Sequence, residues 1–232
     1  MRVITALTRG YKKTDGYATL IERNKALDRF FNGKYPLVLF HEGNIPGRHQ
    51  RYIANQTPNQ SVQFLDISDR WQGGYEGMCR FQMWDVWDIC QHYEMIFRVD
   101  EDCVISEMPT DPFEMMGSNV YLKSCYWGES HSETNASLPQ EIETLTGAKR
   151  DNFYNNKFVY TNVSLAKPSF WLNGMPSLIL KALASHPGQR KNRWGDLPVL
   201  GSLLNIYAQG KVGTLTGLKY KHISHNVEVV CG

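Results

Sequence analysis

The chain has 232 residues, 42% of them hydrophobic and 12% aromatic, which is enough to bury the core of one large α/β domain. Its formal net charge of +2, with acidic and basic residues interspersed, excludes a basic nucleic-acid-binding surface or an acidic tail. No uninterrupted apolar run approaches the ~20 residues that a membrane span needs. Five cysteines without a C-x-x-C spacing argue against a zinc site and favour reduced thiols in the cytoplasm.

Three apolar strands are expected in the first third of the chain, at residues 2–7, 36–40 and 62–67. Apolar side chains at helical spacing predict a helix over 15–32, and a short helix is expected over 46–54. The second strand is continuously apolar, as parallel sheets require, whereas the alternating pattern of the third favours a sheet edge.

A helix that begins near Tyr75 directs Trp84 and Trp87 toward the core, and a buried strand follows from Met95. The resulting order β-α-β-α-β-α-β is that of the nucleotide-binding half of a doubly wound sheet. We therefore expect residues 1–105 to form this half of a single domain.

Beyond residue 105 the pattern loosens, and the remaining residues, 106–232, are expected to form the acceptor-binding half. Further strands are expected at 120–127, 158–165, 212–218 and 220–225, and helices at 139–150 and from 168. The polar stretch 128–137 is expected to be a loop that can move over the site. The last helix is expected to begin with Asp196 as its N-cap and a proline in its first turn.

Two carboxylates, Asp100 and Asp102, follow the strand that starts at Met95. In an open α/β sheet this end of a strand faces the ligand crevice, and side chains at i and i+2 of an extended chain share a face. Such carboxylates repel each other unless a cation lies between them, and Mg²⁺ or Mn²⁺ takes one or two carboxylates plus substrate phosphates. This D-x-D arrangement predicts a metal site for a nucleotide-sugar diphosphate; a solvated acidic turn is the alternative. Asp102 is expected to coordinate the metal directly, whereas Asp100 is expected to bind either the metal or the donor ribose.

Three further residues are candidates for binding the donor. Thr8 and Arg9 follow the first strand, where backbone N–H groups and a guanidinium can face phosphate or ribose, although an ordinary turn is equally compatible. Arg80 could contact the diphosphate, because its guanidinium fork matches phosphate oxygens. The alternative for Arg80 is an ion pair that caps the helix containing Trp84.

Several short blocks, taken together, resemble the fungal α-1,2-mannosyltransferase family, Golgi enzymes that use GDP-mannose and Mn²⁺. The blocks are Tyr75-x-x-Met-Cys-Arg-Phe, Arg98-Val-Asp-Glu-Asp, Thr161-Asn-Val-Ser-Leu, Trp194-Gly-Asp-x-Pro-Val and Tyr220-Lys-His. The resemblance spans roughly residues 75–225. It implies the GT-A type of α/β fold, a Rossmann-like mixed β-sheet flanked by helices, in a distant, soluble relative.

The resemblance also implies a set of metal ligands. In the Glu-Pro-Asp motif of the family, Asp100 takes the position of Glu and Asp102 that of Asp, and His222 matches a late histidine ligand. An imidazole ligand favours Mn²⁺ over Mg²⁺. A surface histidine is the alternative for His222, and His225 is the substitute ligand in that case.

One position departs from the family. Ser164 stands where the family carries a Glu that is proposed as the nucleophile of a retaining mechanism. A serine without an evident base is a poor replacement for a carboxylate. This departure argues against the covalent retaining route and leaves the sugar open, and the donor base can be that of GDP or UDP.

Asp196 has two interpretations. As an N-cap it contributes about 1 kcal/mol, and as an acid facing the acceptor hydroxyl it can act as general base, typically worth about 10²–10⁴-fold. We expect the acceptor-facing role and favour an inverting reaction, because Ser164 replaces the Glu. Trp194, beside Asp196, is expected to form an apolar wall for the acceptor, with Asn162 and Ser164 on the same side.

The sequence therefore predicts a metal-dependent glycosyltransferase that moves a sugar from a nucleotide-sugar donor to a glycan or another hydroxyl acceptor. Two alternatives remain: a non-catalytic nucleotide-sugar-binding domain, which Ser164 favours, and a metal-dependent nucleotidyltransferase, which would release pyrophosphate. Family members are membrane-anchored in the Golgi. Without an anchor in this chain we expect a cytoplasmic protein, with a Golgi lumenal domain lacking its anchor as the alternative.

Overall fold

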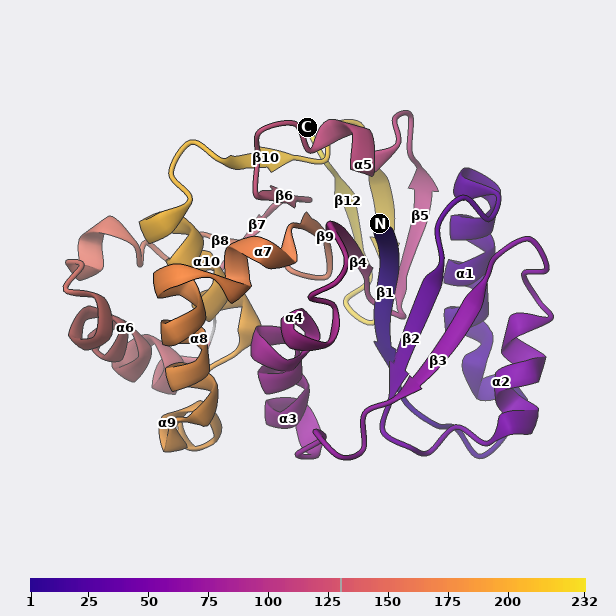
Figure 1. Cartoon of the computed structure of the whole chain (residues 1–232), viewed down its shortest axis with the longest axis horizontal. Coiled ribbons are helices and arrows are strands. Elements are labelled where there is room, and N and C mark those ends of the chain that lie inside the picture. Colours follow the sequence, from indigo (N-terminus) through magenta and orange to yellow (C-terminus); the bar gives the residue numbers. More distant parts are fainter. Residues whose placement is uncertain (130) are drawn as a thin grey trace.

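The apolar strands of the first third form the parallel part of a seven-stranded mixed sheet. The computed structural model describes residues 1–129 and 131–232 (Figure 1). Across the sheet the strands follow the order β10 (Val212–Thr214), β6 (Tyr121–Lys123), β9 (Val163–Ala166), β4 (Met95–Val99), β1 (Arg2–Thr8), β2 (Leu37–His41) and β3 (Val62–Asp66). Strands β4, β1, β2 and β3 are mutually parallel, and β9 runs antiparallel to β4 and β6. The expected edge position of the third strand is confirmed.

Two smaller sheets complete the strand structure. One has the order β12 (Val227–Val230), β11 (Lys219–His222) and β5 (Cys103–Glu107), and the other pairs β7 (Tyr126–Trp127) with β8 (Phe158–Val159). Strand β11 runs antiparallel to β5 with His222 opposite Cys103. The end of the chain therefore returns to the residues that directly follow β4.

Helices cover both faces of the large sheet (Figure 1). One layer contains η1 (Thr14–Tyr17), α1 (Ala18–Phe31), α2 (Gly47–Ala54) and α5 (Pro112–Met115). The other contains α3 (Gly74–Arg80), η2 (Phe81–Asp85), α4 (Val86–Ile89), α6 (Ser132–Thr146), η3 (Arg150–Asn152), α7 (Pro168–Leu172), α8 (Gly174–Ser185), α9 (Pro187–Lys191) and α10 (Asp196–Tyr207). Within the described residues, no helix combines the length and apolar character needed to cross a bilayer.

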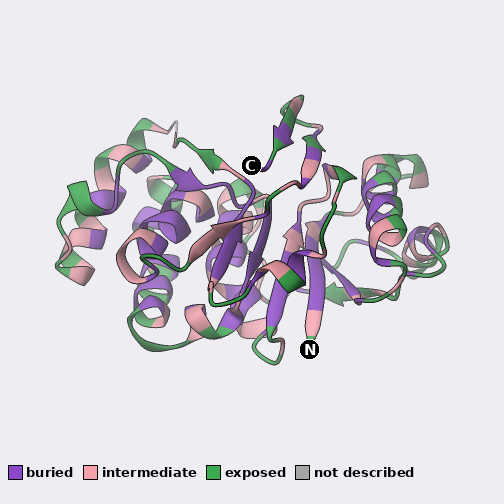
Figure 2. Ribbon diagram, turned by 90° about the horizontal axis from the view of Figure 1, so that it is seen from above, coloured by how far each residue is buried: buried purple, intermediate pink, exposed green. Residues whose placement is uncertain are grey.

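The alternation of side chains along the central strands creates two cores. Val3 of β1 and Ile96 of β4 pack with the helices of the second layer, whereas their neighbours Ile4 and Phe97 pack with α1 and the three-stranded sheet. Successive side chains of a strand point to opposite faces, so a continuously apolar strand supplies both cores. Figure 2 shows these central strands buried along most of their length.

Two expected strands are each interrupted. The segment 120–127 divides into β6 and β7, and the segment 158–165 divides into β8 and β9. In both cases the first and second parts belong to different sheets. The interruption in the second segment contains Tyr160 and Asn162, which both line the pocket described below.

The expected loop at 128–137 is partly wrong, because α6 begins at Ser132 and continues past Pro139. Ser130, within that segment, lies outside the described residues. A proline inside a helix leaves the carbonyl four residues earlier without its usual donor. Here the Asn135 carbonyl accepts a hydrogen bond of 3.3 Å from the Arg150 guanidinium, which compensates for the missing N–H.

Replacing Gly201 of α10 with alanine is expected to destabilise the fold. A Cβ at this position would lie 2.7 Å from the Phe158 Cβ atom, where α10 packs on β8. We expect a loss of about 1–3 kcal/mol from overpacking, which outweighs the gain in helix propensity of about 1 kcal/mol. Chemical denaturation measures the change, and Gly47→Ala in α2, where the nearest atom is 3.6 Å away, is the matched control. Equal stability of the two variants would contradict this packing.

Candidate active site

The chain turns directly after β4, and this turn carries the acidic motif. The Asp100 N–H donates to the Asn162 carbonyl at 2.9 Å, and the Cys103 N–H closes the turn on the Asp100 carbonyl at 3.0 Å. The Ile223 N–H, just after β11, donates to the Asp102 carbonyl at 2.9 Å. One of these hydrogen bonds closes the turn itself, and the other two fix it to segments far apart in the sequence.

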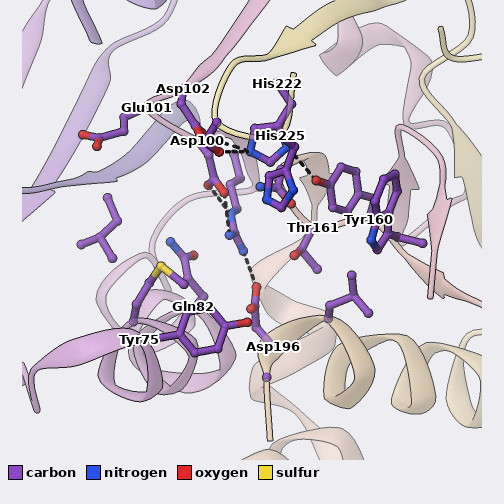
Figure 3. A pocket seen from close by; sticks show the side chains of 18 of the residues that line it. Tyr75, Gln82, Asp100, Glu101, Asp102, Tyr160, Thr161, Asp196, His222 and His225 are labelled. Carbon is purple, nitrogen blue, oxygen red and sulfur yellow. Dashed lines mark hydrogen bonds and ion pairs between the residues drawn. The ribbon is translucent and has the colours of Figure 1, made fainter. Parts of the chain in front are cut away.

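The backbone is not extended at this point, so the strand argument for a shared face does not apply to Asp100 and Asp102, and their role as metal ligands stays a prediction. The two carboxylates instead engage different partners: Asp100 binds Arg98, and Asp102 binds His222 (Figure 3). The acidic motif therefore divides into a carboxylate–imidazole pair and a carboxylate–guanidinium pair.

The first pair consists of Asp102 and His222, with the His222 Nε2 atom 3.2 Å from Asp102 Oδ2. The other ring nitrogen of His222, Nδ1, lies 2.6 Å from the Tyr160 hydroxyl. Burial alone would raise the pKa of Asp102, but hydrogen bonds from His222 and Ser224 lower it to about 2. Ligand atoms of Asp102, Cys103 and His222 all lie within 4.8 Å of one another, so this corner can hold a cation.

The second pair extends across the site through Arg98. Its Nε and Nη2 atoms donate to the two oxygens of Asp100 at 2.8 and 3.0 Å, and its Nη1 donates to Asp196 Oδ2 at 2.7 Å. The expectation that Asp196 is the N-cap of the last helix is wrong. Helix α10 begins at Asp196 itself, and Gly195 is its N-cap. The Asp196 carboxylate binds Arg98 instead. Burial opposes the charge of Arg98, but its two carboxylate partners raise its pKa well above the usual range.

A pocket of about 720 Å³ contains both pairs. Eight residues that the sequence singles out line it: Thr8, Arg9, Asp100, Asp102, Asn162, Asp196, His222 and the substitute ligand His225. They come from the ends of β1, β4, β8 and β11 and from the start of α10. The carboxyl ends of the parallel strands thus form one side of the pocket, as in other open α/β sheets.

Arg80 and Ser164 do not line this pocket. Arg80 forms an ion pair with Asp85 within the same helical segment, which is the structural alternative considered for it. Ser164 is buried on β9, and its hydroxyl donates to the Thr161 carbonyl at 3.3 Å. Neither side chain is placed to contact a ligand in the pocket.

Trp194 is also absent from the pocket lining and is only 2% exposed. Its Nε1–H donates to the Ser137 hydroxyl at 2.9 Å, and its ring stacks on His186 with centroids 4.9 Å apart. The tryptophan beside Asp196 thus packs in the protein interior and anchors the start of α10 instead of forming an acceptor wall.

Two groups behind the acidic motif had no assigned role in the sequence. Glu101 lines the pocket and accepts hydrogen bonds from the Thr8 and Tyr11 hydroxyls, while burial raises its pKa. Arg23 of α1 is fully buried, and none of its side-chain nitrogens has a hydrogen-bond partner in the described part of the chain. Burial lowers the pKa of Arg23 to about 10, against the opposing effect of Glu101 and Asp100. Its charge offsets part of the negative charge of the turn.

Arg98 belongs to the block Arg98-Val-Asp-Glu-Asp, but the sequence predicted no role for its side chain. A charged residue inside the apolar run of β4, two positions before Asp100, is the signal that could have identified it. Side chains at i and i+2 share a strand face, and a charged side chain in a buried strand usually has a partner of opposite charge. The partner across the site, Asp196, is 98 residues away and could not be found by spacing.

The parallel β4-β1-β2-β3 half, the antiparallel β9 and the acidic turn at the carboxyl end of β4 are those of the GT-A type of α/β fold. Searches with family models and among curated proteins find no match.

Among solved structures, the chain is similar to core-mannan synthase A from Aspergillus fumigatus in its Mn/GDP form, with a TM-score of 0.80 and 16% identity over 96% of this chain and 74% of that chain. It is also similar to the mannosyltransferase Ktr4p from S. cerevisiae, with a TM-score of 0.79 and 15% identity over 95% and 70% of the two chains. Mouse xyloside xylosyltransferase 1 follows, with a TM-score of 0.55 and 11% identity over 93% and 85%. The resemblance to the fungal mannosyltransferases is thereby confirmed in the fold.

Proposed function

We propose that this protein is a metal-dependent glycosyltransferase that moves a sugar from a nucleoside-diphosphate sugar to a hydroxyl acceptor. The observation that carries the proposal is the Asp102–His222 pair, which shares one pocket with the Arg98-bound Asp196. The fold is shared with core-mannan synthase A, whose structure is a Mn/GDP form, and this likeness supports the proposal.

The donor atoms at this corner fit a divalent cation. The Asp102 carboxylate, whose pKa is lowered to about 2, and an imidazole nitrogen of His222 form a mixed oxygen and nitrogen set, which suits Mn²⁺ better than Mg²⁺. Tyr160 fixes the orientation of His222 through its second ring nitrogen, as partners of metal-binding histidines commonly do. A divalent cation held by Asp102 and His222 would stabilise the negative charge that develops on the leaving diphosphate.

We place the nucleotide on the side formed by residues 1–105. Thr8 and Arg9 end the first strand in the pocket, and Glu101 is fixed beside them by the Thr8 hydroxyl. A guanidinium and backbone N–H groups at this position suit the ribose or phosphates of a GDP- or UDP-sugar. Both carboxylate oxygens of Asp100 accept hydrogen bonds from Arg98, so Asp100 contributes a fixed negative charge next to the cation ligands.

We place the acceptor on the side formed by residues 106–232, next to Asp196 and Asn162. Arg98 binds Oδ2 of Asp196, and no described residue donates to Oδ1, so this atom is left for an acceptor hydroxyl. As general base, Asp196 would remove the hydroxyl proton in an inverting reaction, a role typically worth about 10²–10⁴-fold. Ser164, buried outside the pocket, supplies no nucleophile for the covalent alternative.

A thermal-shift screen of GDP, UDP and their sugars, with Mn²⁺ and with a chelator, tests this function. A ligand that binds the folded state raises the melting temperature by mass action. We expect one nucleotide family to stabilise the protein, only with the metal, and we expect its sugar to be transferred or hydrolysed with release of nucleoside diphosphate. Stabilisation that is insensitive to chelator, or release of pyrophosphate, would contradict the proposal.

A further inference from the structure

Two stacked aromatic rings line the pocket on the side of residues 106–232. The rings of Trp127 and Tyr160 have centroids 4.9 Å apart and planes inclined by 18°. Both residues line the pocket, but they differ in exposure, because Tyr160 is 5% exposed and Trp127 is 39% exposed. The indole thus keeps a large apolar surface open beside the ligand space.

The small β7–β8 sheet fixes the position of this indole. Trp127 pairs with Phe158, and Tyr160 follows two residues later, so the two stacked rings are diagonal neighbours across the strands. The Tyr160 N–H continues the pairing with a 2.9 Å hydrogen bond to the Cys125 carbonyl, and its hydroxyl holds His222. The indole is therefore held in place by its neighbours without being buried.

The surroundings of the indole combine a flat apolar face with polar groups. Asn162 and Asp196 line the same pocket, and Asp196 has one oxygen free of described donors. A pyranose matches this combination, because one face of the ring carries C–H groups while its edge carries hydroxyls. Aromatic side chains supply such an apolar surface at a small conformational cost, since they have few rotatable bonds.

We propose that Trp127 forms a subsite for a pyranose ring of the acceptor, which stacks on the indole and directs a hydroxyl toward Asp196. This inference rests on the proposed function and names the substrate class of the same site. A nucleoside base is the other flat ligand that could stack here, but the candidate nucleotide-binding residues Thr8 and Arg9 belong to the opposite half of the chain.

Kinetic analysis of Trp127→Ala separates the two ligands. We expect the KM for a saccharide acceptor to rise about five- to tenfold, a loss equivalent to one aromatic stacking contact, with the KM for the donor unchanged. Trp127→Phe should lie in between. Tyr126→Ala, which removes the neighbouring ring of β7 that is 54% exposed and outside the pocket lining, is the control and should leave both KM values unchanged.

Saturation-transfer NMR provides a readout that does not depend on turnover. The probes are the methyl glycosides of glucose, galactose, mannose and xylose, added to the complete protein. We expect saturation to reach the ring protons of at least one glycoside in the wild type and in Tyr126→Ala, and to fall in Trp127→Ala. No transfer to any of the four glycosides, or equal transfer in the Trp127→Ala protein, would overturn the subsite.

The outcomes also distinguish this inference from the proposed function. A rise in the donor KM of Trp127→Ala, with an unchanged acceptor KM, would assign the indole to the nucleotide and overturn the acceptor subsite while leaving the transferase intact. Conversely, if the wild type binds no nucleotide in the presence of Mn²⁺, the proposed function fails, and the glycoside experiment still decides whether Trp127 binds a pyranose.

Discussion

Replacing Asp102 with asparagine is expected to abolish Mn²⁺-dependent nucleotide binding and to lower sugar transfer by about 10³-fold. The asparagine keeps the shape of the side chain but removes the charge of the only carboxylate that lies within 4.8 Å of both Cys103 and His222 among the described residues. A metal ligand of this kind is worth several kcal/mol of transition-state stabilisation, which corresponds to about three orders of magnitude in rate. Isothermal titration with nucleotide and Mn²⁺, together with the transfer rate, measures the effect.

Asp69→Asn is the matched control for this substitution, because Asp69 is an exposed carboxylate on the turn after β3. It should bind nucleotide and Mn²⁺ like the wild type. Unaltered metal-dependent binding in Asp102→Asn, or an equal loss in both variants, would remove Asp102 from the cation site.

Replacing Arg98 with methionine is expected to destabilise the fold by about 3–5 kcal/mol, the usual cost of removing one partner of a buried ion pair. Arg98 lies between Asp100 and Asp196 and is only 12% exposed, so its removal leaves two carboxylates facing each other without a counter-charge. Transfer should also fall, because the position of Asp196 depends on this contact. Urea denaturation and the transfer rate are the two measurements.

A double variant tests whether charge is the cause of this loss. In Arg98→Met with Asp196→Asn, one of the two unpaired carboxylates is neutral, so part of the lost stability should return, although transfer should stay low. Arg51→Met, at an exposed position of α2, controls for the loss of an arginine in general. A double variant less stable than Arg98→Met alone would show that the side chains contribute mainly through packing.

The nucleotide half of the fold was predictable because its signals are local. Each of the strands β1, β2 and β3 is a short segment of strand-like residues followed by a helical pattern, and this alternation is enough to specify parallel strands with crossover helices. The acidic motif was placed correctly at the carboxyl end of β4, since the apolar run ends there. The partners of its two carboxylates, Arg98 and His222, could not be derived in the same way.

The remainder of the site depends on contacts between distant segments. Asp102 and His222 are 120 positions apart in the sequence (222 − 102), and only the resemblance to a known family suggested their contact. Trp194 and Trp127 illustrate the same limit, because the local sequence around each tryptophan is equally compatible with the core and with a pocket wall. The structure buries Trp194 on His186 and leaves Trp127 exposed in the pocket, which no local pattern distinguishes.

Pulsed electron paramagnetic resonance of Mn²⁺ bound to the protein and nucleotide tests the central claim most directly, because it detects nitrogen atoms coordinated to the metal. We predict a coupling to one imidazole nitrogen that disappears in His222→Gln and persists in His92→Gln, where the substituted histidine is exposed. Bound Mn²⁺ without an imidazole coupling, or a coupling that survives in His222→Gln, would contradict the assignment of Asp102 and His222 as the cation site.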